Sequence, residues 1–388
     1  MAVEIVPADS KAELERFIRL PMRLAAKDPN WVSPLMFERR EALSKKINPL
    51  FQHVDAQFWL ARKDGRDVGR ISAQIDHLAK TDPSEPAGYF GMIAAEDNPE
   101  VFAALFETAE GWLRARGRVH AMGPFNLSIN EEVGLLIDGF DTRPMFLMGH
   151  DQPYVAGRVE ARGYGKVKDV YAYISETFVF NDLIEKRLKR PLPAGMVLRP
   201  VRMNKFREEV AIFTDILNDA WSENWGAAAI TEAEAKYLGD SLGLILKKEW
   251  FWFIEIDGEP AAFIILLPNI VDMIHDLDGR LAPFGWAKLI WRLKFQPIRS
   301  ARVPLMGVRK KFQRDRRGAL APFVLIDAIR AQSVPQGLRR CEYSWILENN
   351  RPMRHILEGL NARIYKTYRI YGKQIAPSPA ATPAPADS

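Results

Sequence analysis

Histidines are the side chains best suited to proton transfer near neutral pH, and this sequence contains six of them. His150 stands out because it is next to Asp151 and ends a segment that also contains Glu131, Glu132 and Asp138. Since a histidine oriented by a carboxylate can act as a general base, we favour His150 as the base, with Glu132 and Asp138 as further candidate catalytic residues. A histidine that only stabilises a loop explains the pattern equally well. The acids could also be solvated, or could anchor a substrate ammonium or hydroxyl group.

Other kinds of reactive centre find little support in the sequence. Cys341 is the single cysteine, which excludes an internal disulfide and a cysteine-based metal cage. Its expected place is a buried strand. There is no HExxH motif and the acids are scattered, so we expect no metal. The absence of RNP, KH, zinc-finger and helix-turn-helix signatures argues against nucleic acid as a partner.

A basic stretch in the later part of the chain calls for an acidic partner. From Gly279 to Arg314 there are ten Lys or Arg residues and no Asp or Glu. Within it, residues 281–300 mix tryptophans and other apolar residues with basic ones, a composition typical of a helix lying on a membrane surface. We expect peripheral contact with the cytoplasmic membrane through this stretch. An ordinary helix packed on a sheet, with solvated arginines, is the alternative.

Two stretches of the chain carry one pattern. Residues 58–71 read FWLARKDGRDVGRI and residues 251–264 read FWFIEIDGEPAAFI. Each is an apolar run, an Asp-Gly pair and a second run, which predicts a β-hairpin. Strand-like and helix-like segments then alternate in the same order in both halves of the chain. The repeat indicates a duplicated mixed α/β unit.

The length of 388 residues also favours two domains over a single core. We place the first domain at 1–180, with a long insert at 127–151, and the second at 197–373, with an amphipathic insert at 279–301. The Pro/Ala-rich segment 374–388 is expected to be disordered. No secretory signal and no apolar run of about 20 residues is present, so we expect a cytoplasmic protein.

The second half resembles the GNAT acyltransferases, which transfer an acyl group from coenzyme A to an amine. The resemblance is carried by ARVPLMGV (301–308) followed by a basic loop and a helix, by WILENN (345–350) with its helix, and by ARIYKTYRIYGK (362–373). It implies acyl-CoA as co-substrate. The corresponding loop of the first half, AAEDNPE (94–100), is acidic and would repel a pyrophosphate, so we expect acyl-CoA in the second half.

The GNAT resemblance also implies roles for particular residues. A backbone N–H near Gly307 would stabilise the oxyanion. Residues implied to contact acyl-CoA are Met306, Val308, Arg316, Arg317, Gly318, Ala319 and Asn349. The loop lacks the central glycine of the family pattern, so a solvated basic loop is the alternative. Leu357 occupies the place of the tyrosine that protonates the leaving thiolate in many members.

The inserts resemble a narrower bacterial group of tandem GNAT proteins that includes the bacterial ceramide synthases. The likeness lies in GPFNLSINEEVGLLIDGFDTRPMFLMGHDQPY (123–154) and NDAWSENWG (218–226). It implies N-acylation of a long-chain sphingoid amine, 3-oxosphinganine or sphinganine, by a fatty acyl-CoA. The implied substrate contacts are Asn126, Asn130, Glu131, Tyr154, Asn224 and Trp225. Transfer to a non-lipid amine, and a non-catalytic acyl-CoA-binding protein, are the alternatives.

Overall fold

The two repeated stretches form β-hairpins in the computed structural model, which describes residues 2–82, 84–243 and 246–377. Strands β2 (Val54–Lys63) and β3 (Arg66–Asp76) form the first hairpin, and β9 (Phe251–Ile256) and β10 (Glu259–Pro268) form the second. In both turns the Asp and the Gly have positive φ angles, as a two-residue type I′ turn requires. The Asp-Gly pairs therefore set the turn geometry in each half.

The first half follows the expected order of elements. Around the hairpin lie β1 (Glu4–Pro7), α1 (Lys11–Leu24), α2 (Met36–Ala42), β4 (Ala87–Ala95), α3 (Pro99–Arg114), β5 (His120–Gly123), β6 (Leu135–Asp138), α4 (Tyr154–Glu160) and β7 (Gly165–Ser175). Helix α1 begins with a capping box made by Ser10 and Glu13, and α3 begins with an Asn98 cap before Pro99.

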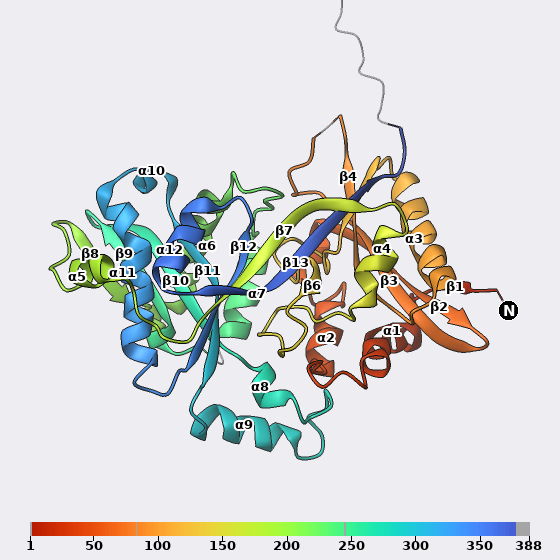
Figure 1. Ribbon diagram of the computed structural model, residues 1–388, viewed down its shortest axis with the longest axis horizontal. Coiled ribbons are helices and arrows are strands. Elements are labelled where there is room, and N and C mark those ends of the chain that lie inside the picture. Colours follow the sequence, from red (N-terminus) through yellow and green to blue (C-terminus); the bar gives the residue numbers. More distant parts are fainter. Residues whose placement is uncertain (1, 83, 244–245, 378–388) are drawn as a thin grey trace, which may run out of the picture.

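The second half repeats this order with different connections. After the linking helix α5 (Asp182–Leu188) come β8 (Met196–Pro200), α6 (Phe206–Trp221), α7 (Glu232–Leu242), the second hairpin, α8 (Val271–Ile274), α9 (Gly285–Phe295), β11 (Ser300–Val308), α10 (Lys310–Gln313), α11 (Arg316–Ser333), β12 (Arg340–Leu347), α12 (Arg351–Gly359) and β13 (Arg363–Gln374). In Figure 1, α8 and α9 lie at the lower edge of the molecule.

One sheet runs through both halves of the chain. In the described residues its order is β1-β2-β3-β4-β5-β13-β7-β12-β11-β10-β9-β8, and β6 also pairs with β13. The last strand of each half therefore leaves its own half: β13 pairs with β5, and β7 pairs with β12. Figure 1 shows these two strands side by side between the halves. The sequence gives no sign of this exchange, because both strands simply follow a helix in their own half.

Helices and the first-half insert cover the sheet. Helix α3 packs against β2, β3 and β4 in the first half, and α11 packs against β9, β10 and β11 in the second. The central strands β7 and β13 are covered by the insert, whose Leu136, Met145 and Met148 cluster with Val170 and Tyr368. The insert thus lies against the centre of the molecule, between the two hairpins.

Several expected boundaries differ from the structure. The expected helix 231–246 ends at Leu242, and the expected strand 120–126 ends at Gly123. Pro322, expected in the first turn of a helix, lies inside α11, which begins at Arg316. Strand β13 continues to Gln374, and residues 378–388 of the tail expected to be disordered lie outside the described residues.

Candidate active site

Strands β11 and β12 separate part of the way along their length. Residues Ser300–Val303 of β11 pair in parallel with Arg340–Tyr343 of β12, and the described strands do not pair beyond these residues. A cavity of about 90 Å³ opens there, and we call this place the β11–β12 gap. Its lining includes Met306, Ser344, Trp345, Ile346 and Asn350.

The corresponding β4–β5 gap is closed by the chain itself. Residues Ala87–Tyr89 of β4 pair with His120–Met122 of β5. Beyond these residues the N–H of Phe125 donates to Phe90 O at 2.9 Å. The N–H of Met92 donates to Asn126 Oδ1 at 2.7 Å. A Cβ added to Gly91 would lie 1.9 Å from Phe125 O, so the segment just before the insert packs directly on the strand. Asn126 is thus engaged in closing this gap.

A second cavity adjoins the β11–β12 gap. It has a volume of about 100 Å³ and shares Trp221, Asn224 and Trp345 with the gap, and we call it the middle cavity. Trp225 and Asn130 also line it, and Asn130 Nδ2 donates to Ala228 O at 3.1 Å, which joins the insert to the α6–α7 loop. The structure therefore brings three of the expected substrate contacts, Asn130, Asn224 and Trp225, to one place beside the gap.

A further cavity lies mostly in the first half, with Val271 and Ile274 of α8 in its wall. It measures about 210 Å³, and we call it the large cavity. Apolar residues from α1, the α1–α2 loop, the insert and α8 form much of its wall, among them Met22, Trp31, Met145 and Ile274. The polar part of its lining consists of Glu38, Arg39, Arg70, Asn126, Glu132, His150, Asp151, Gln152 and Tyr154.

His150 lies in the wall of the large cavity and is paired with Asp28. His150 Nε2 is 3.0 Å from Asp28 Oδ2, while the buried Nδ1 has no hydrogen-bond partner among the described residues. Burial lowers the pKa of His150, although Asp28 opposes this shift. The neutral ring with its proton on Nε2 would leave Nδ1 as a free acceptor, which is the form a general base needs.

The carboxylate that orients His150 is not one of the acids that the sequence placed beside it. Asp151 Oδ2 instead accepts the N–H of Leu136 at 3.0 Å, and burial raises the pKa of Asp151 to about 7. Asp28 comes from the α1–α2 loop, 122 residues earlier in the chain. No local pattern links the two residues, so the sequence offered no signal for this pair.

The other acids of the insert have separate surroundings. Glu132 lines the large cavity, accepts from Asn126 Nδ2 at 2.9 Å and lies 3.2 Å from Arg39. Burial raises the pKa of Glu131 to about 7. Asp138 is exposed on β6 and is absent from the lining of the cavities described above. The structure therefore brings Glu132, but not Asp138, to the cavity of His150.

A thin wall separates His150 from the expected thioester position. Met148 lines the large cavity, and its Sδ is 3.5 Å from the Oγ of Ser344, which lines the β11–β12 gap. Arg302 supports this wall by donating to Phe146 O at 3.0 Å and to Ser344 Oγ at 2.7 Å. His150 and Met306 thus line different cavities, and the structure does not bring them together.

The expected pyrophosphate loop is largely occupied by its own ion pairs. Asp315 caps α11 by accepting the N–H of Arg317 at 2.7 Å, and the Arg317 side chain pairs with Asp315 and Asp257. Arg316 is exposed and has no ion pair among those found in the described chain. A Cβ on Gly318 would lie 1.9 Å from Phe312 O, so this glycine lets α10 pack on α11. Arg316 is the predicted cation still open to a phosphate.

The remaining predicted residues divide between cavity and scaffold. Met306 lines the gap, and its carbonyl accepts from Trp221 Nε1 at 3.3 Å. Asn350, rather than the expected Asn349, lines the gap, while Tyr154 donates to Ala95 O at 2.6 Å. The other predicted residues belong to the scaffold. Gly307 faces Phe263, and the carbonyl of Val308 accepts from Gln313. Ala319 lies in the first turn of α11, and Leu357 is fully buried in the core.

Among the described residues no group of three or more His, Cys, Asp or Glu side chains is arranged to hold a metal ion. None of the helices in the described parts of the chain has the length and apolar character that a membrane span would need.

Comparison with known proteins identifies relatives along nearly the whole chain. It is 54% identical to the bacterial ceramide synthase of Caulobacter vibrioides (strain NA1000 / CB15N) over 376 residues, which cover 96% of this chain and 98% of that protein. It is 44% identical to protein YghO of Escherichia coli (strain K12) over 367 residues, 94% of each chain. No family model matches the sequence.

A solved structure with the same fold supports the architecture. The tandem GNAT protein from the clavulanic acid biosynthesis pathway superposes with a TM-score of 0.59 at 15% identity, covering 97% of this chain and 100% of that one. This likeness confirms the expected mixed α/β, tandem GNAT fold. Together with the 54% identity, it shows that the chain belongs to the family of GNAT-fold proteins that contains the bacterial ceramide synthase.

Proposed function

We propose that the protein transfers a fatty acyl group from acyl-CoA to the amine of a long-chain sphingoid base, 3-oxosphinganine or sphinganine. The observation that carries this proposal is the 54% identity to the bacterial ceramide synthase over nearly the full length of both chains. The open β11–β12 gap supports it, because strands that separate provide a slot in which an extended thioester can lie beside backbone N–H groups.

In the proposed reaction the amine nitrogen attacks the thioester carbonyl carbon directly. The new C–N bond forms, the C–S bond breaks, and the proton lost by the amine is taken up by the thiolate of coenzyme A. The acyl donor occupies the β11–β12 gap with Met306 and Ser344, and the acceptor approaches through the middle cavity past Asn224 and Trp225. The two cavities share Trp221, Asn224 and Trp345 in their walls, so the reacting groups would approach each other at these residues.

His150 remains our candidate for the base. Its free Nδ1, its Asp28 partner and its lowered pKa support this role. The contact between Met148 and Ser344 is the barrier that substrate binding has to open for His150 to act. Because buried Leu357 stands where many GNAT members have a tyrosine, the thiolate of coenzyme A would find another proton donor or leave unassisted.

The reaction can be tested with purified protein, palmitoyl-CoA, and either sphinganine or 3-oxosphinganine. We expect thiol release together with the N-acyl product in mass spectrometry. Thiol release without amide would mean hydrolysis and a different acceptor. Binding of acyl-CoA with neither product would favour the non-catalytic alternative, and amide formation only on water-soluble amines would favour a non-lipid acceptor.

We further propose that α9 rests on the anionic surface of the cytoplasmic membrane. Its outer side exposes Phe284, Trp286, Ile290, Trp291 and Phe295, with exposed fractions of 46–78%. Its other side is fixed to the protein, because Arg292 and Lys288 pair with Asp276. Neighbouring α8 lines the apolar large cavity through Val271 and Ile274, which places hydrocarbon-compatible space beside the proposed membrane contact.

Vesicle co-sedimentation tests this contact. A double variant, Trp286→Glu with Trp291→Glu, should bind anionic vesicles about tenfold more weakly, since it loses interfacial aromatics and gains two repelled charges. Leu183→Glu is the matched control, because Leu183 is a large apolar residue 80% exposed on α5. Equal loss in both proteins, or none in either, would contradict a specific role of α9.

A further inference from the structure

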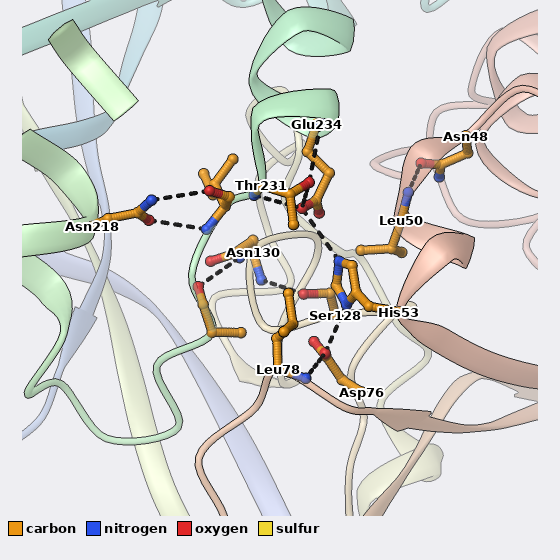
Figure 2. Close-up of polar contacts among 12 residues, drawn as sticks. Asn48, Leu50, His53, Asp76, Leu78, Ser128, Asn130, Asn218, Thr231 and Glu234 are labelled. Carbon is orange, nitrogen blue, oxygen red and sulfur yellow. Dashed lines mark hydrogen bonds and ion pairs between the residues drawn. The ribbon is translucent and has the colours of Figure 1, made fainter. Parts of the chain in front are cut away.

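An Asp–His–Glu arrangement joins the two halves of the molecule beside the middle cavity (Figure 2). His53, just before β2, has its Nδ1 at 2.9 Å from Oδ1 of Asp76, the last residue of β3. Its Nε2 lies 3.2 Å from Oε2 of Glu234 in the first turn of α7. Leu78 N–H also donates to Asp76 Oδ1 at 2.9 Å. One carboxylate oxygen of Asp76 is therefore fully engaged in structure.

The other oxygen of Asp76 is not engaged. The Asp76 side chain is only 2% exposed, and within the described chain its Oδ2 is buried without a hydrogen-bond partner. A buried polar atom in this state costs free energy unless a ligand supplies the missing donor. Since Oδ1 fixes the orientation of the carboxylate, Oδ2 is available to such a donor at no cost to the fold.

Asp76 lines a cavity with aromatic walls. This cavity, which we call the Asp76 cavity, has a volume of about 110 Å³ and is also lined by Tyr89, Phe125 and Trp225. The Phe125 and Trp225 rings stack at 6.4 Å, and Tyr89 meets Phe125 edge-on at 4.9 Å. The cavity has one cationic side chain in its described lining, Lys80, whose Nζ donates to Ser222 O at 2.7 Å.

A carboxylate together with aromatic faces is the chemistry that recognises an organic ammonium ion. The aromatic rings attract the positive charge through their negative faces, and Oδ2 accepts an N–H bond. An alcohol of the same shape can donate an O–H bond to Oδ2 but carries no positive charge, so it gains neither the ion pair with Asp76 nor the cation–π interaction with the rings. The cavity therefore discriminates by charge rather than by size.

We propose that the Asp76 cavity binds the ammonium form of the long-chain amine acceptor before acylation. The proposal rests on the function proposed above, and it adds the site where the charged head group is recognised. The Asp76 cavity shares Lys80, Ile129 and Trp225 with the middle cavity, which in turn shares residues with the β11–β12 gap. The bound amine would therefore lie next to the cavities proposed for the reaction, and it would lose its proton on the way to the thioester.

His53 and Glu234 act as positioning residues in this site. His53 hydrogen-bonds to Asp76 Oδ1, while Glu234 lies 3.2 Å from the buried His53 Nε2, which has no hydrogen-bond partner among the described residues, and caps α7 with Thr231. Because Asp76 comes from the first half and Glu234 from the second, the ammonium site is complete only when both halves are in place.

Asp76→Asn tests the site with little change of shape. The amide oxygen can still accept from His53 and Leu78, whereas the charge and the free Oδ2 are lost. The probes are dodecylamine, which is an ammonium ion at pH 7, and dodecanol, measured by calorimetry on the full-length protein. We expect the wild type to prefer the amine by roughly ten- to a hundredfold, the value of one charge-assisted bond, and Asp76→Asn to lose most of that preference.

Asp55→Asn is the matched control. Asp55 also pairs with a histidine, His77 at 2.9 Å, but this pair lies on the surface with both side chains more than half exposed. It should keep the full preference for the amine. In kinetics, Asp76→Asn should raise the KM for sphinganine by about tenfold or more and leave the KM for palmitoyl-CoA unchanged.

Two results would overturn the proposal. The first is an unchanged preference for amine over alcohol in Asp76→Asn, and a lower melting temperature beside it would indicate a purely structural role of Asp76. The second is an equal loss of preference in Asp55→Asn. The calorimetry needs no turnover, so a wild type that binds the amine selectively but forms no amide would contradict only the proposed function.

Discussion

The β4–β5 gap and the β11–β12 gap occupy corresponding places in the two halves but are in opposite states. In the first, Phe125 and Asn126, just before the insert, hydrogen-bond to the backbone of β4 and close the opening. In the second, the described strands β11 and β12 have no backbone pairing beyond Val303 and Tyr343, and a cavity remains. The same pair of parallel strands has thus been sealed in one half and left open in the other.

We infer from this difference that the two halves have separate tasks. A sealed gap cannot accept a thioester, so the first half is free to use its insert as a wall of the molecule's centre. The open gap adjoins the middle cavity, where Asn224 and Trp225 lie. Variants can test this difference. One fills the open gap, one adds an atom inside the closed gap, and one removes His150 from the large cavity to test its part in catalysis.

Filling the open gap should have the largest effect. In Ile346→Trp the indole ring would occupy much of the cavity of about 90 Å³ beside Met306. We expect loss of acyl-CoA binding and a decrease in kcat/KM of roughly a thousandfold or more, since the thioester would lose its position. Val197→Trp, at a half-exposed site on β8, is the control for the added bulk. Near-normal turnover in Ile346→Trp would place the acyl donor elsewhere.

Adding a side-chain atom inside the closed β4–β5 gap should instead lower the stability of the protein. Gly91→Ala puts a Cβ 1.9 Å from Phe125 O, which is a backbone atom and cannot easily move away. We expect a loss of about 3 kcal/mol in unfolding free energy, measured by urea denaturation. Gly111→Ala on α3 has its nearest neighbour atom at 3.9 Å and should be neutral or slightly stabilising. Equal stability of the two variants would contradict the described seal.

His150→Ala asks whether the large cavity takes part in chemistry. If His150 is the base, kcat should decrease about a hundredfold, and His77→Ala should change little because His77 is exposed. Burial lowers the pKa of His150, so the wild-type rate should stay flat from alkaline pH down through 6.5 and decrease only below it. Unchanged kcat in His150→Ala would confine the chemistry to the second half.

Arg316→Ala should have a smaller effect on the acyl donor. Arg316 is the predicted loop cation without an ion pair in the described chain, so we expect it to contact a phosphate near the surface. Its loss should raise the KM for acyl-CoA about fivefold, with kcat retained. Arg190→Ala, an exposed site near α5, is the control. If acyl-CoA binds equally well to Arg316→Ala, the loop is simply solvated.

Asp151→Asn should produce the smallest change, visible only as a pH dependence. Burial raises the pKa of Asp151 to about 7, so the folded protein keeps this proton between the ordinary value and pH 7 while the unfolded chain loses it. Stability from this group is therefore lost as pH rises through 7. The variant should melt a few degrees higher than wild type at pH 8 and about equally at pH 4. The opposite order would mean that Asp151 is ionised and paired.

Much of the architecture was already determined by the sequence. The Asp-Gly turns, the alternation of strands and helices, and the cap residues act over a few positions, and each appears where local chemistry predicts it. The exposed aromatic face of α9 and the burial of Cys341 also follow from composition alone. Asn224 and Trp225 were found because a motif holds them side by side in the chain.

What only the tertiary structure decided are the contacts between residues far apart in the chain. The partner of His150 is Asp28. His53 lies between Asp76 of the first half and Glu234 of the second. Strands β7 and β13 each pair with a strand of the other half. The seal of one gap depends on where the insert folds back, and the wall at Met148 depends on Ser344. Such pairings are set by packing across the whole core, which no local pattern of residues encodes.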